Sequence, residues 1–183
     1  MSVEGKTMPQ AATGQAAEQQ VSWPYVMPHS GFLSAVEQRQ LDAVFAQIVP
    51  RDPARRIPGA TDAGAARFVS LLLAMDAAVY DEIPAWRLLY RAALAALDAH
   101  SRQIHGTSLE QLADPEMIML LKRLEQGQLT PLELPAGTTQ PTVFKTFWRH
   151  CLQGCFADPR WGGNQDRIMW RWLGYLQQPE EVL

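Results

Sequence analysis

Apolar residues recur along most of the chain at intervals of three and four, which is the spacing of one face of an α-helix. The first such run is Leu41, Val44, Phe45, Ile48 and Val49. Ser34 and Glu37 precede it as a capping box, in which each side chain can bond to the backbone amide of the other residue. Pro50 follows the run and cannot continue a helix, so the pattern predicts a first helix between Ser34 and Pro50.

Two further runs follow the segment "RDPARRIPGATDAG", which its prolines and glycines mark as a loop. The first run predicts a helix with one apolar face, made of Phe68, Leu71, Leu72, Met75 and Val79. The second predicts the longest helix, with Pro84 in its first turn and Gly106 at its end. The inward side chains expected on that helix are Trp86, Leu89, Tyr90, Ala93, Leu94 and Leu97.

Three shorter helices are expected in the last third of the chain. Asp114 and Pro115 suit the N-cap and first position of a helix that Gly127 closes. The next helix spans about 143–156, with one side formed by Phe144, Phe147, Trp148, Cys151 and Cys155. A last helix follows a Gly-Gly pair, with Asn164 as its N-cap and Gly174 at its end. No alternating run is long enough to predict a strand, so we expect an all-α fold with a single helical domain, residues 31–183, of about five to six helices.

The first 30 residues contain little that could be buried in a core. Residues 1 to about 20 are mainly Gly, Ala, Gln, Thr and Glu, a composition typical of a disordered tail. The stretch "VSWPYVMPHS" follows and predicts an extended strap, because its prolines disfavour a helix. Trp23, Tyr25 and Met27 would place this strap against a surface, either of this subunit or of a partner.

Composition excludes several classes of protein. The 183 residues are 47% hydrophobic and 19% charged, with a net charge of −3, which argues against a nucleic-acid-binding protein. Two cysteines cannot form a disulfide scaffold, and no apolar run is long enough to span a membrane. Without a signal peptide or a twin-arginine motif in this sequence, we expect a cytoplasmic location. A periplasmic location would follow from export with a partner, or from a signal missing here.

The candidate chemistry is sparse. Cys151 and Cys155 form C-x3-C, which is neither a haem-attachment nor a redox motif, and they are expected to be buried as small apolar side chains. His100 and His105 lie near a helix end, where a cation is stabilised by the helix dipole. No phosphate-binding glycine loop and no pair of poised carboxylates is present. We therefore expect no catalytic, cofactor-binding or metal-binding residue in this chain.

The stretch "CFADPRWGGNQDRIMWRWLGY", from Cys155 to Tyr175, is the most distinctive, since four of the six tryptophans lie between Trp148 and Trp172. One interpretation is a rigid corner. Asp158 and Pro159 stop a helix, Gly162 and Gly163 form a turn, and Asn164 and Asp166 begin the next helix, with Trp170 and Trp172 in the core. The other interpretation is that Arg160 and Trp161 project into a partner, because Arg and Trp are favoured anchors in interfaces. The two interpretations are compatible with each other.

The same stretch resembles the C-terminal signature of the small, third subunit of bacterial gluconate 2-dehydrogenases. The matching residues are Phe156, Ala157, Asp158, Pro159, Arg160, Gly162, Gly163, Asn164, Asp166, Trp170, Gly174 and Tyr175. "FLSAVEQRQLDAVFAQIVPRD" and "YRAALAALDAHSRQIHG" are similar to earlier blocks of that family, in the same order. Met169, Leu176, Ile104 and the missing twin-arginine signal are departures.

The resemblance implies a non-catalytic subunit that binds and stabilises a large flavoprotein, and helps it to fold or to be exported. That partner would be of the glucose–methanol–choline (GMC) oxidoreductase type and would hold FAD while oxidising sugars, sugar acids or related alcohols. A multihaem cytochrome c would take the electrons. Two alternatives are an independent helical adaptor with several partners and a small enzyme acting alone.

Overall fold

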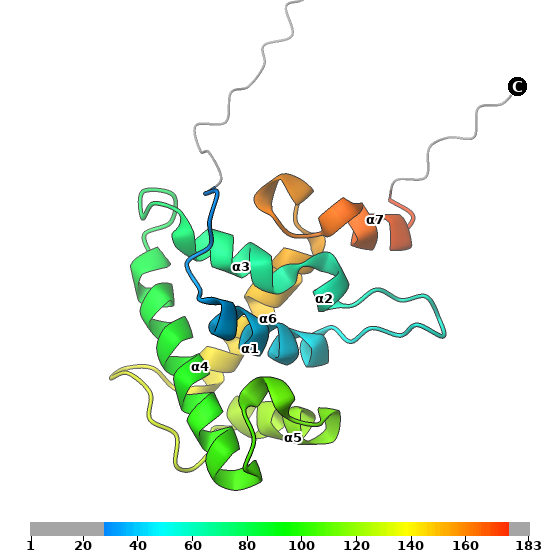
Figure 1. Ribbon diagram of the computed structural model, residues 1–183. Coiled ribbons are helices and arrows are strands. Elements are labelled where there is room, and N and C mark those ends of the chain that lie inside the picture. Colours follow the sequence, from blue (N-terminus) through cyan, green and yellow to red (C-terminus); the bar gives the residue numbers. More distant parts are fainter. Residues whose placement is uncertain (1–27, 176–183) are drawn as a thin grey trace, which may run out of the picture.

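The computed structural model describes residues 28–175, and all regular structure within that range is helical (Figure 1). The α-helices are α1 (Ala35–Ile48), α2 (Ala60–Ala63), α3 (Ala65–Ala74), α4 (Ile83–His105), α5 (Asp114–Glu125), α6 (Gln140–Phe156) and α7 (Ile168–Trp172). Three short 3-10 helices are η1 (Leu109–Gln111), η2 (Pro159–Trp161) and η3 (Gln165–Arg167). The all-α prediction is confirmed. The predicted tail and nearly all of the predicted strap lie outside the described residues.

Together with α1, which packs against α2, α3, α4, α5 and α6, helix α6 is central to the molecule and packs against α1, α2, α3, α5 and α7. Its buried side chains meet those of α1, α3, α4 and α5 in one core. The fully buried large side chains of that core include Leu41, Phe45, Leu73, Tyr90, Leu94, Leu97, Leu124 and Phe147. Phe45 and Phe147 meet edge to face with their ring centroids 6.4 Å apart. The inward-facing residues expected on the first and longest helices therefore include much of the actual core.

The predicted start of the first helix is confirmed in detail. The Ser34 hydroxyl accepts a hydrogen bond from the Glu37 amide at 3.3 Å, and the Glu37 carboxylate accepts one from the Ser34 amide at 2.7 Å. The helix ends at Ile48, before Pro50. The predicted end of α4 is also confirmed, because Gly106 takes a left-handed conformation with φ of 72°.

The loop predicted over "RDPARRIPGATDAG" is partly wrong, because its last residues form α2. The Asp62 carboxylate accepts a hydrogen bond from the Gly59 amide at 2.9 Å and so stabilises the first turn. Gly64, with φ of 68°, separates α2 from α3. The rest of the segment is a projecting loop in which Asp52 and Ile57 pair through two backbone hydrogen bonds of 2.9 Å.

Two helix boundaries differ from the prediction. Val79 is not helical, because α3 ends at Ala74 and the Asp76 carboxylate accepts from the Ala78 amide at 2.8 Å, which forms a turn. Asp114 is the first residue of α5 and not its N-cap, which is Ala113. The Asp114 carboxylate instead accepts a hydrogen bond from the Gln47 side chain at 2.7 Å.

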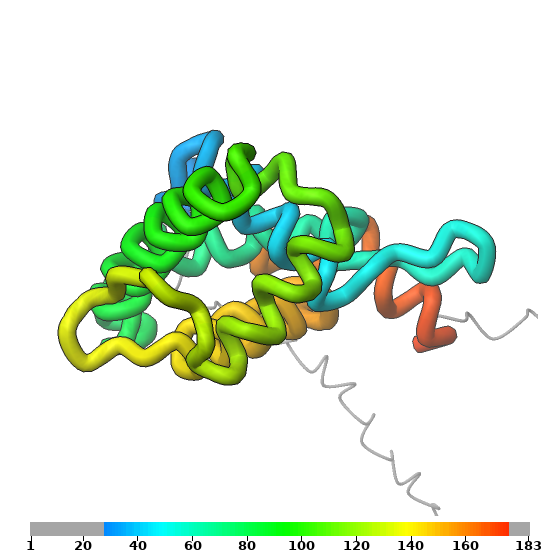
Figure 2. Tube along the Cα trace, turned by 90° about the horizontal axis from the view of Figure 1, so that it is seen from below, coloured from blue at the N-terminus to red at the C-terminus, as the bar shows by residue number. Residues whose placement is uncertain are grey.

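The molecule has two dissimilar ends (Figure 2). The projecting loop between α1 and α2 and the short α7 lie at one end, and the loop between α5 and α6 lies at the other. The first described residues and α7 are both at the upper edge of Figure 1. The distinctive C-terminal stretch is therefore on the same side of the molecule as the start of the described chain.

Candidate functional site

Residues 157–175, here called the C-terminal corner, begin where α6 ends. The Asp158 carboxylate accepts hydrogen bonds from the Arg160 amide at 3.0 Å and from the Arg160 guanidinium at 2.7 Å. These bonds, the one from the guanidinium first, lower the pKa of Asp158. Asp158 and Pro159 thus end α6 and begin η2, as the sequence predicts.

Gly162 and Gly163 serve different purposes in the turn. Gly162 has φ of 88°, a conformation that side chains with a Cβ rarely adopt. Gly163 allows a close approach, since a Cβ there would overlap the Gly154 carbonyl of α6. Next to it, the Asn164 amide donates to that same carbonyl at 2.8 Å. The glycine pair therefore turns the chain and then lets it lie directly on α6.

Asn164 is completely buried and connects the two helices. It is the N-cap of the short η3, without a side-chain capping bond, whereas the N-cap of α7 is Arg167, so the predicted capping of the last helix is only partly confirmed. The Asn164 Nδ2 donates to the Ala157 carbonyl at 3.2 Å, and its Oδ1 accepts from the Met169 amide at 3.0 Å. It has φ of 43°, and η3 intervenes before α7 begins at Ile168. Asp166 also has positive φ, 53°, and is therefore not a regular first-turn helical residue.

The tryptophans of α7 are less buried than predicted. Met169 takes the core position, Trp170 is half-buried, and Trp172 is 46% exposed. The prediction that Trp170 and Trp172 lie in the core is wrong, because α7 is a short helix of five residues in which only Met169 is buried. Trp170 has a structural role, since its indole Nε1 donates to the Phe156 carbonyl at 2.9 Å. Its ring also meets Tyr175 at a centroid distance of 5.3 Å.

The corner carries an exposed apolar surface, which we call the C-terminal apolar face. Phe156, Trp170, Leu173 and Tyr175 line a shallow depression of about 440 Å³. Leu173 is 58% and Tyr175 is 73% exposed. Exposed apolar clusters of this kind are typical of protein–protein contact sites. Phe156, Trp170 and Tyr175 belong to the predicted signature, but only the tertiary structure shows that they form one exposed surface with Leu173.

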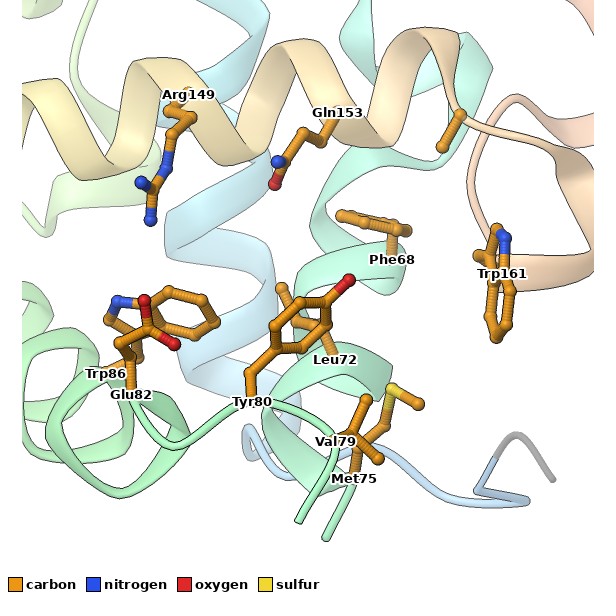
Figure 3. Close-up of a pocket in the computed structure, with 11 residues that line it drawn as sticks. Phe68, Leu72, Met75, Val79, Tyr80, Glu82, Trp86, Arg149, Gln153 and Trp161 are labelled. Atoms are coloured by element: carbon orange, nitrogen blue, oxygen red, sulfur yellow. The ribbon is translucent and has the colours of Figure 1, made fainter. Parts of the chain in front are cut away.

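A second apolar feature, the aromatic groove, lies beside the corner (Figure 3). It has a volume of about 520 Å³. Its lining residues are Phe68, Leu72, Met75, Val79, Tyr80, Glu82, Trp86, Arg149, Gln153, Ala157 and Trp161. Most of the apolar face predicted for the second helix therefore faces this groove. Val79 contributes from the turn beyond α3, and the groove itself was not predicted.

The predicted partner contacts occupy different environments. Arg160 is at the surface and pairs with Asp158. Trp161 is half-buried, packs against the core and lines one end of the aromatic groove. Trp23, Tyr25 and Met27 lie outside the described residues. The role of these five residues in an interface stays a prediction.

The polar groups buried near the groove are held by structural contacts. His150 is fully buried, its Nδ1 lies 3.0 Å from the Tyr90 hydroxyl, and its ring meets that of Trp86 at 4.6 Å. Burial and, next, the Arg149 charge lower the pKa of His150 to about 4. Arginine can only donate, so His150 Nε2, 3.3 Å from Arg149, is assigned as an acceptor. A neutral histidine in this position is a structural group.

The remaining candidate groups have similar structural roles. Cys151 and Cys155 are both buried, as predicted, and the hydrogen bond of the Cys151 thiol to Cys155, and then burial, raise the pKa of Cys151. His100 Nδ1 lies 3.3 Å from the Pro131 carbonyl, and His105 pairs with Glu116. Across residues 28–175, no three His, Cys, Asp or Glu side chains gather closely enough to hold a metal ion. No helix in that range has the length and apolar character needed to cross a membrane.

Comparisons with known proteins show which family this chain resembles. A family model described as "Gluconate 2-dehydrogenase subunit 3" matches residues 35–176, which include α1 to α7 and the whole signature. A search of curated proteins and a search of solved structures each returned no significant match.

Proposed function

Since this chain belongs to the gluconate 2-dehydrogenase subunit 3 family, we propose that it is the subunit that binds and stabilises the large flavoprotein of such a complex. In this proposal the partner is a GMC-type oxidoreductase that holds FAD and oxidises a sugar, a sugar acid or a related alcohol. This chain contributes no catalytic residue. The observation that carries the proposal is the family match over residues 35–176.

The main contact surface with the flavoprotein is, in this proposal, the C-terminal apolar face. Phe156, Leu173 and Tyr175 are exposed, yet hydrogen bonds within the corner hold the backbone beneath them. A surface that is already ordered loses little conformational entropy when it binds. Arg160 and Trp161, on the same corner, are proposed as additional contacts. The predicted interface is of the obligate kind, with about 2,000 Å² or more buried.

In this proposal the contact surface extends along α6. Trp148, 48% exposed, precedes Phe156 by two helical turns, with Leu152 midway between them. Residues at such intervals share one side of a helix. A flavoprotein surface that covered Tyr175 and Leu173 could therefore continue along α6 and cover Trp148.

Co-expression with a candidate GMC-type flavoprotein from the same organism tests the proposal. We expect a stoichiometric complex that survives mild salt and shows the flavin absorption spectrum. The double substitution Leu173→Ser with Tyr175→Ser should weaken the complex by at least about 30-fold, which is the effect of losing a single hot-spot residue that contributes about 2 kcal/mol. The matched control is Leu88→Ser with Ile104→Ser, two exposed apolar residues of α4.

Three outcomes would contradict the proposal. If the two proteins eluted separately under mild salt, the flavoprotein would not be a partner of this chain. Binding to several unrelated proteins would favour an independent adaptor. Substrate turnover by this chain alone, abolished by substitution of His100, His105 or His150, would favour a small enzyme. A multihaem cytochrome c as electron acceptor and a cytoplasmic location stay predictions, which purification and fractionation of the native host would test.

A further inference from the structure

The aromatic groove is an apolar channel formed by three parts of the chain. In Figure 3, α6 forms one wall, from which Arg149 and Gln153 point inward. The turn between α3 and α4 forms the opposite wall with Tyr80 and Val79, and α3 forms the floor with Phe68 and Leu72. Trp86 lies at one end of the channel and Trp161 at the other. Four of its eleven lining residues are aromatic: Phe68, Tyr80, Trp86 and Trp161.

The described chain begins beside this groove. The Phe32 amide donates to the Ser70 carbonyl at 2.9 Å, and the Leu33 amide donates to the Ser70 hydroxyl at 3.1 Å. These bonds fix the incoming chain to α3, whose other side forms the groove floor. In Figures 1 and 3 the first described residues lie between the turn after α3 and the loop that carries Trp161.

The sequence just before this point matches the chemistry of the groove. In the segment "VSWPYVM", Val21, Trp23, Tyr25 and Met27 alternate with smaller side chains. In an extended backbone, alternate side chains share one face, so the four large apolar groups would point the same way. Pro24 and Pro28 favour an extended backbone in the residues around them and carry no amide hydrogen. Proline-containing segments are commonly bound by grooves lined with aromatic side chains.

The segment is also long enough. Along α6 the groove runs from Arg149 to Ala157, which at 1.5 Å per residue is about 12 Å. Seven extended residues, 21–27, span up to about 23 Å. The segment can therefore turn into the groove from Pro28 and run its full length.

We propose that residues 21–27 of this same chain occupy the aromatic groove, with Trp23, Tyr25 and Met27 against its apolar lining. Arg149 and Gln153 would supply hydrogen bonds to the backbone of the segment. A directly attached segment has a local concentration in the millimolar range, which favours it over a free partner peptide. The inference does not rest on the proposed function. It makes the groove part of the subunit's own fold and leaves the C-terminal apolar face for the flavoprotein.

Photo-crosslinking of the full chain tests this placement. The photoreactive residue p-benzoylphenylalanine replaces Tyr25, and in a matched control it replaces Met8. After irradiation at low protein concentration, mass spectrometry locates the cross-links. We expect position 25 to link within its own chain to residues 68–86 or 149–161, and position 8 to give no such preference. Val79→Asp, in the groove wall, should reduce this yield about tenfold, and the exposed control Leu88→Asp should not.

Hydrogen exchange of the unmodified full chain provides an independent readout. If the proposal is correct, amides of residues 21–27 exchange more slowly than those of residues 1–20, and Val79→Asp removes that difference. Links from position 25 to a second copy of the chain, to the co-expressed flavoprotein or to regions outside the groove would overturn the proposal. The absence of any cross-link above the Met8 control, together with unprotected amides, would overturn it as well.

Discussion

Asn164 is the single side chain that joins the end of α6 to the start of α7. Its amide group bonds to the Ala157 carbonyl and to the Met169 amide, and its own backbone amide bonds to Gly154. Asn164 and Met169 are fully buried, and Ala157 is half-buried. Removal of the side chain would leave the buried Met169 amide and the half-buried Ala157 carbonyl without these partners.

Asn164→Ala should therefore lower the free energy of unfolding by about 2–3 kcal/mol, the cost of unpaired buried polar groups. Urea unfolding followed by circular dichroism measures the change. The control is Asp166→Asn, at an exposed position of the same corner, which should change stability by less than about 0.5 kcal/mol. Equal effects of the two substitutions would show that Asn164 does not hold the corner.

His150 makes the stability of the molecule depend on pH. Its pKa in the folded state is about 4, below the value of 6.5 for an unperturbed histidine, so the unfolded chain binds more protons between these values. The neutral form is favoured by the fold. Stability contributed by His150 is thus present above about pH 6.5 and is lost as pH falls toward 4.

Between pH 7 and pH 5 the free energy of unfolding should fall by about 2 kcal/mol through this histidine. Urea titrations at the two pH values measure it. His150→Gln should be less stable at pH 7 but should lose much less stability between pH 7 and pH 5. An unchanged pH dependence in that variant would assign the effect to other groups.

At the scale of elements, the fold depends on how closely α6 approaches α3. Gly154 of α6 lies against Ala65 of α3, and a Cβ at position 154 would be 2.8 Å from the Ala65 Cα. Gly154 has a second close contact, because a Cβ at position 163 would overlap the Gly154 carbonyl. Three segments therefore meet at Gly154 with no room for a side chain.

Gly154→Ala should destabilise the protein by about 1–2 kcal/mol, although alanine favours a helix more than glycine by about 1 kcal/mol. The reason is overpacking against the Ala65 backbone. An exposed residue of the same helix offers a control, Lys145→Ala, which should be nearly neutral. Thermal unfolding compares the two variants, and a raised melting temperature for Gly154→Ala would contradict the close contact.

At the scale of the whole molecule, the buried polar groups support structure and the exposed apolar groups are available for binding. His150, Tyr90 and Asn164 are buried and hydrogen-bonded, whereas Leu173 and Tyr175 are exposed on the ordered corner. This distribution suits a subunit that stabilises a partner.

The corresponding prediction concerns flavin. This chain purified alone should show no flavin absorption, and the co-purified complex should show it in proportion to the large subunit. Gel filtration with absorbance detection at visible and ultraviolet wavelengths measures both. Flavin bound stoichiometrically to the isolated chain would contradict the assignment of FAD to the partner.

The sequence by itself determined the features that depend on local chemistry. The capping box at Ser34, the end of α4 at Gly106 and the turn at Gly162 follow from the conformations that those residues favour, and the structure has each of them. The all-α class follows from apolar periodicity, and family membership follows from the signature around Asp158–Tyr175, which the match over residues 35–176 confirms.

Only the tertiary structure decided which surfaces face water and which face one another. Apolar periodicity shows that Phe68, Leu72 and Met75 share a side of a helix, but not that this side lines an open groove. It also cannot tell that Met169, and not Trp172, enters the core, because α7 is a short helix of five residues whose orientation Asn164 sets from a distance. Burial and exposure depend on packing between segments far apart in the sequence, and local pattern carries no information about that packing.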